Sequence, residues 1–253
     1  SSGLREVVRR VNPDIIINAA AYTNVDKAES EPSLARAINA VGPGVLAEEA
    51  KKTNAVLVHY STDYVFDGTK GSPYVETDTP NPLSVYGLTK LEGEQAITAS
   101  GCVNLVLRSS WIYSRRSGFV AKVLEWARTQ EVIRIVDDQI SSPTSARLMA
   151  EITASLISKI ETNPDNWMNE RKGIYHCVFI GYCSRYEWAK EVLRLASNSG
   201  RVPGQQLLPA MTAEFSTPAQ RPLRSCLDSS KFENTFEMKM PHWLRALELA
   251  MED

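Results

Sequence analysis

The sequence predicts an α/β fold: a parallel sheet flanked by helices, followed by a smaller carboxyl-terminal lobe. Short apolar runs rich in β-branched residues alternate with longer stretches of helical spacing, which is typical of a parallel sheet buried on both faces. Residues 15–20, 55–60 and 103–108 are the clearest of these runs. From Arg201 to Arg224 the chain is irregular and interrupted by prolines, which indicates a lobe with little regular structure.

The other elements follow in chain order from the spacing of apolar residues. Helices are expected over 4–11, about 34–52 with Pro43 as a kink or local start, 87–95, 119–130, about 146–160, and from a capping box at Ser184–Glu187 onward. Strands are expected over 15–20, 55–60, 103–108, 132–136 and 173–180. Asn12-Pro13-Asp14 separates the first helix from the first strand, because proline does not continue a helix.

Composition excludes several classes of function. The chain has 253 residues, of which 43% are hydrophobic and 23% charged, as in an ordinary globular protein. Its net charge of −2 provides no basic surface for nucleic acid, and no apolar run approaches the roughly 20 residues of a membrane span. No signal-peptide core is present, and the four cysteines and three histidines lack metal-binding spacing. We therefore expect a cytoplasmic protein without a metal, a membrane or a nucleic acid as partner.

Polar residues follow one of the predicted strands directly. Ser61, Thr62 and Asp63 come immediately after the apolar run at 55–60. In open α/β sheets, ligands bind in the crevice outside the carboxyl ends of the strands. We therefore expect Ser61 and Thr62 to lie in a ligand site.

Tyr86 and Lys90 form the second part of this candidate site. They are four residues apart at the expected helix 87–95, so their side chains share one face about one turn apart. A phenol with its ordinary pKa of about 10 exchanges protons poorly near neutrality, but a nearby ammonium favours the ionised phenol. The spacing therefore predicts an acid–base tyrosine whose pKa a lysine lowers. Taken alone, such a pair is more often an ordinary tyrosine and a solvated lysine.

Longer segments around these residues give a more specific indication. They are STDYVFDG at 61–68, NPLSVYGLTKLEGE at 81–94, RSSWIY at 108–113 and VDDQISSPTSA at 136–146. With them the chain resembles, from about Val11 to Trp243, the dTDP-4-dehydrorhamnose reductases of the extended short-chain dehydrogenase/reductase superfamily.

The resemblance implies an enzyme of dTDP-rhamnose biosynthesis that uses NADPH or NADH to reduce the 4-keto group of dTDP-4-dehydro-L-rhamnose. Tyr86 would be the general acid, Lys90 would lower its pKa and hold the nicotinamide ribose, and the Thr62 hydroxyl would hydrogen-bond the carbonyl oxygen. The implied cofactor contacts are Ala21, Tyr22, Thr23, Tyr60, Tyr86 and Lys90, and the implied dTDP-sugar contacts are Thr62, Asp63, Trp111 and Arg221. Without the resemblance, Trp111 would be expected in the hydrophobic core. Arg221 would be expected to form a structural ion pair as readily as a contact with phosphate.

One part of a Rossmann-like sheet is not found. Such a sheet begins with a strand and a glycine-rich turn that holds the cofactor pyrophosphate, and no such turn precedes Ile15. Relative to the family, the chain starts about one βαβ unit late, so we expect an amino-terminally truncated Rossmann-like sheet. Residues 1–138 are then expected to form the dinucleotide-binding domain and 139–253 mainly a substrate-binding lobe, from which 173–180 return to the sheet. The choice between NADH and NADPH stays open, because the residue that contacts the ribose 2′ position would lie in the missing unit.

Two other classes of protein fit the same motifs. One is a non-catalytic regulatory subunit, since the β subunit of methionine adenosyltransferase resembles these reductases; Ser61-Thr62 matches the reductases better. The other is a related sugar-nucleotide epimerase or dehydratase. The oligomeric state is also open, with a homodimer as one candidate.

Overall fold

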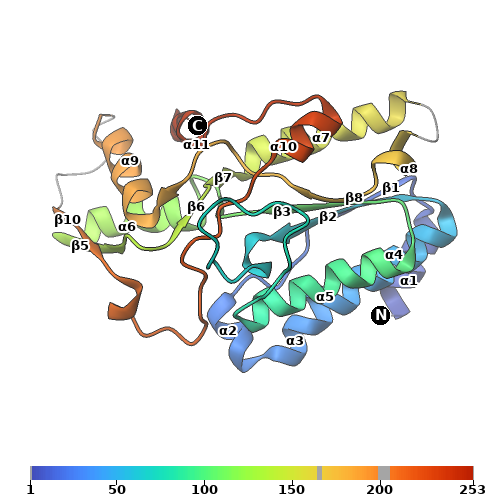
Figure 1. The fold of residues 1–253 in the computed structure, drawn as a ribbon, viewed down its shortest axis with the longest axis horizontal. Helices are drawn as coiled ribbons and strands as arrows, with labels where there is room; N and C mark the ends of the chain where they lie inside the picture. Colours follow the sequence, from blue (N-terminus) through green and yellow to red (C-terminus); the bar gives the residue numbers. More distant parts are fainter. Residues whose placement is uncertain (1, 164–166, 199–205, 253) are drawn as a thin grey trace.

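A four-stranded parallel sheet forms the centre of the computed structural model, which describes residues 2–163, 167–198 and 206–252 (Figure 1). The strands lie in the order β1-β2-β3-β8 and every neighbouring pair is parallel. Their bounds are Ile15–Asn18 for β1, Val56–Thr62 for β2, Asn104–Ser109 for β3 and Gly173–His176 for β8. The predicted α/β fold with a parallel sheet is therefore confirmed.

Helices cover both faces of this sheet, as Figure 1 shows. On one face lie α1 (Ser2–Val11), α4 (Gly42–Thr53) and α5 (Val85–Ser100); on the other lie α7 (Ala146–Thr162) and α10 (Ser230–Phe236). The alternation of β2 explains the two apolar layers. Leu57 packs with Leu46 and Ile97 of the first layer, whereas Val58 belongs to the larger cluster on the opposite face.

The helical pattern predicted for 34–52 is divided in the structure. A short helix α3 (Pro32–Arg36) passes into a π-helical turn, η1 (Ala37–Val41), and then into α4, with Pro43 in its first turn. Proline fits there because the first helical turn needs no backbone donor. The sequence pattern did not indicate the preceding helix α2 (Val25–Ser30) or the π-helical turn.

The carboxyl-terminal half adds small sheets and helices beside the main sheet. Strand β5 (Val132–Val136) pairs in parallel with β10 (Gln206–Ala210), β4 (Ile112–Tyr113) with β7 (Thr144–Ser145), and β6 (Ile140–Ser141) is antiparallel to β9 (Cys183–Ser184). The helices are α6 (Phe119–Thr129), α8 (Trp167–Arg171), α9 (Arg185–Asn198) and α11 (Trp243–Glu252). Part of the irregular segment 201–224 lies outside the described residues; its remainder contains β10 and a short 3₁₀ turn, η3 (Thr212–Glu214). None of the described helices is both long and apolar enough to cross a membrane.

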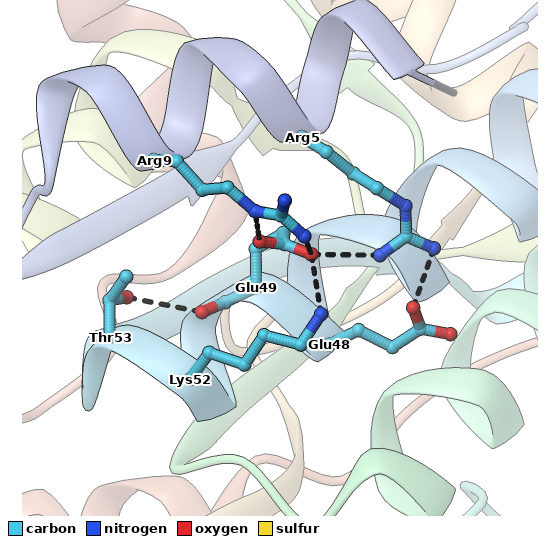
Figure 2. Close-up of polar contacts among 6 residues, drawn as sticks. All are labelled: Arg5, Arg9, Glu48, Glu49, Lys52 and Thr53. Atoms are coloured by element: carbon cyan, nitrogen blue, oxygen red, sulfur yellow. Dashed lines mark hydrogen bonds and ion pairs between the residues drawn. The ribbon is translucent and has the colours of Figure 1, made fainter.

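Ion pairs connect α1 to α4. The Glu49 carboxylate is fully buried and accepts hydrogen bonds from Arg5 (2.8 Å), Arg9 (2.5 Å) and Lys52 (2.8 Å) (Figure 2). Arg9, Lys52 and Arg5 together hold the pKa of Glu49 well below its usual range. Val8 is the buried side chain of α1. The ion cluster and Val8 together therefore fix the position of this helix on α4.

Candidate active site

A cavity of about 580 Å³ opens at the carboxyl ends of β1, β2 and β3. Its size is within the range of about 300–1,000 Å³ that small-molecule sites occupy. The cavity brings together most of the residues that the sequence predicts for the site: Ala21, Thr23, Tyr60, Thr62, Asp63, Tyr86, Lys90 and Trp111. Tyr22 and Arg221 are not part of its wall.

The start of α5 places Tyr86 beside the end of β2. Ser84 is the N-cap, and its hydroxyl accepts a hydrogen bond from the Gly87 N–H (3.2 Å). A Cβ at Gly87 would lie 2.2 Å from the Tyr64 carbonyl oxygen, so only glycine permits this approach. The Tyr64 and Tyr86 rings meet edge to face with their centres 5.8 Å apart. The phenol of Tyr86 is thereby held at the carboxyl end of the sheet.

Lys90 is one turn further along α5 and is buried. Its Nζ donates to the Tyr60 carbonyl oxygen (2.6 Å) and lies 3.2 Å from His59 Nε2. An ammonium has three hydrogens, so one remains for a ligand in the cavity. Burial lowers the pKa of Lys90 to about 8, against the opposing effect of Glu94. The side chain is therefore largely charged at neutral pH.

The pKa of Tyr86 differs from the sequence prediction. Burial raises it, the Thr62 side chain opposes this shift, and Lys90 is not among the groups that move it. The prediction that Lys90 lowers the pKa is therefore wrong for the protein without ligands. The physical reason is that burial removes water from the phenol, which disfavours the charged phenolate. The phenol keeps its proton at neutral pH, as a proton donor must.

Thr62 and Asp63 form a buried polar pair at the end of β2. The Thr62 hydroxyl donates to Asp63 Oδ1 (3.1 Å) and accepts from the Tyr64 N–H (3.2 Å). Asp63 Oδ2 accepts hydrogen bonds from the Ser141 hydroxyl (3.2 Å) and from the Ser225 hydroxyl. Burial raises the pKa of Asp63 to about 6, so its charge changes close to neutral pH.

We expect the Asp63→Asn variant to be more stable than the wild type near pH 7.5, by about 1–3 kcal/mol in the free energy of unfolding. A carboxyl whose pKa rises from 3.8 to about 6 on folding stabilises the fold fully below pH 3.8, and this contribution is lost as the pH rises through 6. Asparagine stays neutral, and its amide oxygen can still accept from Ser141 and Ser225 while its amide N–H donates to the Thr62 hydroxyl. Urea denaturation at about pH 7.5 and about pH 4 checks this, because the difference should vanish at the lower pH. An equal difference at both pH values would contradict it.

Trp111 and Arg185 also line the cavity. Trp111 has a backbone φ of 43°, an unfavourable conformation for a bulky side chain and one that often marks a functional site. Its ring stacks on Trp188 with centres 5.6 Å apart, and the Arg185 Cζ lies 3.9 Å from the Trp111 ring centre. Arg185 was not predicted as a site residue, and its one signal in the sequence is its position inside the Ser184–Glu187 capping box.

The Tyr22 side chain points away from the cavity wall. Its hydroxyl donates to Glu31 (2.6 Å), while its backbone N–H donates to Asn39 Oδ1 (2.8 Å) and its carbonyl accepts from Asn39 Nδ2 (3.1 Å). Asn39 is buried in the π-helical turn and also donates to Thr89 (3.2 Å) on α5. Asn39 therefore fixes the segment of Ala21–Thr23 relative to the helix that carries Tyr86 and Lys90.

A second cavity of about 520 Å³ adjoins the first and shares Thr23 and Arg185 with it. Its wall contains cationic side chains, aromatic rings and no acidic residue among the described residues. The cations are Lys122, Arg134, Arg185 and Arg221, and the rings are Phe119, Trp126 and Phe215. Arg221 is bound by Asp26 through Nη2 (2.6 Å) and Nη1 (3.0 Å). This composition suits a ligand with an aromatic part and negative charge.

The chain is similar to proteins of known function. It is 41% identical over 243 residues to the dTDP-4-dehydrorhamnose reductase of Salmonella typhimurium, an alignment that covers 95% of this chain and 80% of that protein. The solved dTDP-4-dehydrorhamnose reductase of Clostridium acetobutylicum superposes with a TM-score of 0.88 at 34% identity, covering 98% of this chain and 84% of that one. The Bacillus anthracis reductase, solved in complex with NADP, gives a TM-score of 0.87 at 34% identity, covering 99% and 84%.

These similarities confirm the resemblance inferred from the motifs around Thr62, Tyr86 and Trp111. The family described as "RmlD substrate binding domain" matches the sequence over residues 1–253. Since this match spans all of the residues, the chain belongs to the RmlD substrate-binding domain family.

Proposed function

We propose that this chain is an NAD(P)H-dependent sugar-nucleotide reductase that converts dTDP-4-dehydro-L-rhamnose to dTDP-L-rhamnose. The observation that carries the proposal is that Thr62, Tyr86 and Lys90 line one cavity, beside which a cationic and aromatic cavity opens. The names of the relatives favour this function over a regulatory subunit and over an epimerase or dehydratase.

The residues of the first cavity fit the nicotinamide end of the cofactor. Ala19 and Ala21 are small enough to let a flat ring approach the backbone, and Lys90 keeps one ammonium hydrogen for a ribose hydroxyl. We assign the cofactor contacts to Ala21, Tyr22, Thr23, Tyr60, Tyr86 and Lys90, with Tyr22 acting through its backbone. When bound, the reduced nicotinamide supplies the hydride that is added to sugar C4.

The protein side chains handle the proton and the developing charge. Tyr86, which burial keeps protonated, donates its proton to the sugar 4-oxygen as general acid. The Thr62 hydroxyl turns from Asp63 to the same oxygen, and this hydrogen bond strengthens as the oxygen becomes more negative in the transition state.

The sugar nucleotide spans both cavities in this proposal. Its sugar lies against Thr62, Asp63 and Trp111, and its nucleotide enters the second cavity, of which Arg221 is part. We retain the division into a dinucleotide-binding domain at 1–138 and a mainly substrate-binding lobe at 139–253. Helix α6 and strand β5 belong to the first of these domains, yet their residues line the second cavity, which would hold the nucleotide.

The direct test is turnover. The protein is incubated with NADPH or NADH and dTDP-4-dehydro-L-rhamnose, the loss of reduced cofactor is followed by absorbance, and the sugar product is identified by NMR. We expect stoichiometric formation of dTDP-L-rhamnose. Binding of both ligands without any product would favour the regulatory class, and a product epimerised without net oxidation of the cofactor would favour an epimerase.

We also propose that the protein is cytoplasmic and forms a homodimer. The thiols Cys102, Cys177, Cys183 and Cys226 are all free and buried, which suits the reducing cytoplasm. A homodimer is supported by three apolar side chains that are exposed along α3 and η1. They are Leu34 (48%), Ile38 (36%) and Val41 (51%).

A further inference from the structure

Arg185 lies where the two cavities of the candidate active site meet, because it is part of both walls. Its backbone position is fixed by a reciprocal capping box. The Ser184 N–H donates to Glu187 Oε2 (2.8 Å), the Glu187 N–H donates to Ser184 Oγ (3.0 Å), and the Ser184 hydroxyl donates to Asp137. Helix α9 therefore begins at Arg185 on a rigid support.

Aromatic rings and the Tyr64 phenol surround the Arg185 guanidinium, which also interacts electrostatically with Asp63. Its Cζ lies 3.9 Å from the centre of the Trp111 ring and 5.1 Å from that of Phe119. Across residues 2–163, 167–198 and 206–252, no acidic side chain forms an ion pair with it. Burial lowers the pKa of this guanidinium, and Tyr64 and Asp63 oppose the shift only in part. An anionic ligand would offset the remaining cost of burial.

The other arginines of the second cavity already have acidic partners. Arg221 donates to both oxygens of Asp26 and also to Thr217 (3.0 Å). Arg134 is paired with Glu214. A ligand phosphate would have to displace a paired carboxylate from either of these side chains, whereas Arg185 interacts with the Tyr64 phenol and, among the described residues, forms no ion pair.

We propose that Arg185 is the residue that binds the diphosphate of the sugar nucleotide, an inference that rests on the proposed function. With the sugar carbonyl at Tyr86 and the nucleoside beside Phe119 and Trp126, the diphosphate has to cross the boundary between the cavities, where Arg185 lies. A guanidinium can donate two parallel hydrogen bonds to phosphate oxygens while its plane stays stacked on an aromatic ring.

Two ligands that differ only in the diphosphate test this assignment. In the presence of NADP, dTDP and thymidine are titrated into the wild type, Arg185→Gln, Arg185→Lys and the control Arg194→Gln, with calorimetry for dTDP and saturation-transfer NMR for thymidine. Arg194 lies on the same helix, is exposed and is paired with Glu191. We expect Arg185→Gln to weaken dTDP binding by about 10–100-fold and thymidine binding by less than about twofold. Arg185→Lys should bind dTDP with intermediate affinity, and Arg194→Gln like the wild type.

Each other outcome identifies what is wrong. If Arg185→Gln binds dTDP as tightly as the wild type, or if its affinity for thymidine falls as much as its affinity for dTDP, then Arg185 packs the cavity and does not bind the diphosphate. In that case the proposed function still stands, provided that the wild type turns over the keto sugar. If the wild type binds neither dTDP nor the keto sugar, the proposed function fails and the assignment fails with it. Near-ultraviolet circular dichroism of each variant verifies that the aromatic cluster around Trp111 is still folded.

Discussion

The Tyr86→Phe variant is expected to lose about 10²–10⁴-fold in kcat while its affinity for NADPH changes by no more than about threefold. Phenylalanine keeps the ring that packs edge to face on Tyr64 and removes only the hydroxyl to which we assign the proton transfer. Steady-state kinetics with dTDP-4-dehydro-L-rhamnose, together with a titration of NADPH, measures the two quantities separately.

The matched control is Tyr186→Phe, which removes a phenol hydroxyl on α9 from a side chain that is not part of either cavity wall. This control should keep its turnover within about twofold of the wild type. Near wild-type turnover in Tyr86→Phe would show that another group donates the proton. A loss confined to NADPH binding would place Tyr86 in cofactor recognition alone.

The second large effect concerns a buried ion pair that supports the same helix. Glu94 on α5 and Arg108 on β3 approach to 2.6 Å, with side-chain exposures of 1% and 2%, and the Ser61 hydroxyl donates to Glu94 (2.5 Å). We expect Arg108→Met to lower the free energy of unfolding by about 3–5 kcal/mol, because it leaves Glu94 buried and uncompensated. Urea denaturation near pH 7.5 measures the change.

Two further variants separate the charge effect from loss of packing. The double variant Glu94→Leu/Arg108→Met should recover most of the stability, since well-packed apolar residues can replace a buried ion pair at little cost. Arg36→Met breaks the pair with Glu92, also on α5, but these side chains are 47% and 30% exposed; it should cost less than about 1 kcal/mol. A loss below about 1 kcal/mol for Arg108→Met would mean that water reaches the Glu94 carboxylate.

Local periodicity was sufficient to predict the sheet and the central part of the site. The apolar run that ends at Tyr60 is a strand because its neighbours cover both faces, and Thr62, which follows it, lines the cavity at the end of that strand. Trp111 was assigned to the site only through the resemblance to the reductases. Helical spacing likewise predicted that Tyr86 and Lys90 would share a face. These features depend on residues close together in the chain.

Contacts between distant segments could not be predicted in this way. Arg185 reaches Trp111 from 74 positions further along the chain, and Arg221 pairs with Asp26 across 195 positions. The lysine effect on Tyr86 was predicted from spacing, yet the ammonium is engaged by Tyr60 and His59 on the adjacent strand. Spacing along a helix predicts which side chains are neighbours, but it does not predict which hydrogen-bond acceptor on another element a charged side chain will contact.

The ion cluster around Glu49 makes α1 a separable part of the molecule. With Val8 as its buried side chain, the helix has little apolar area to lose when it leaves α4, so its local opening should cost less free energy than unfolding of the sheet. A carboxylate whose pKa is held low on folding stabilises the fold above its unfolded pKa, near 4.5, and that stabilisation is lost as the pH falls further. Acid should therefore release α1 while the strands that carry Thr62 and Trp111 stay paired.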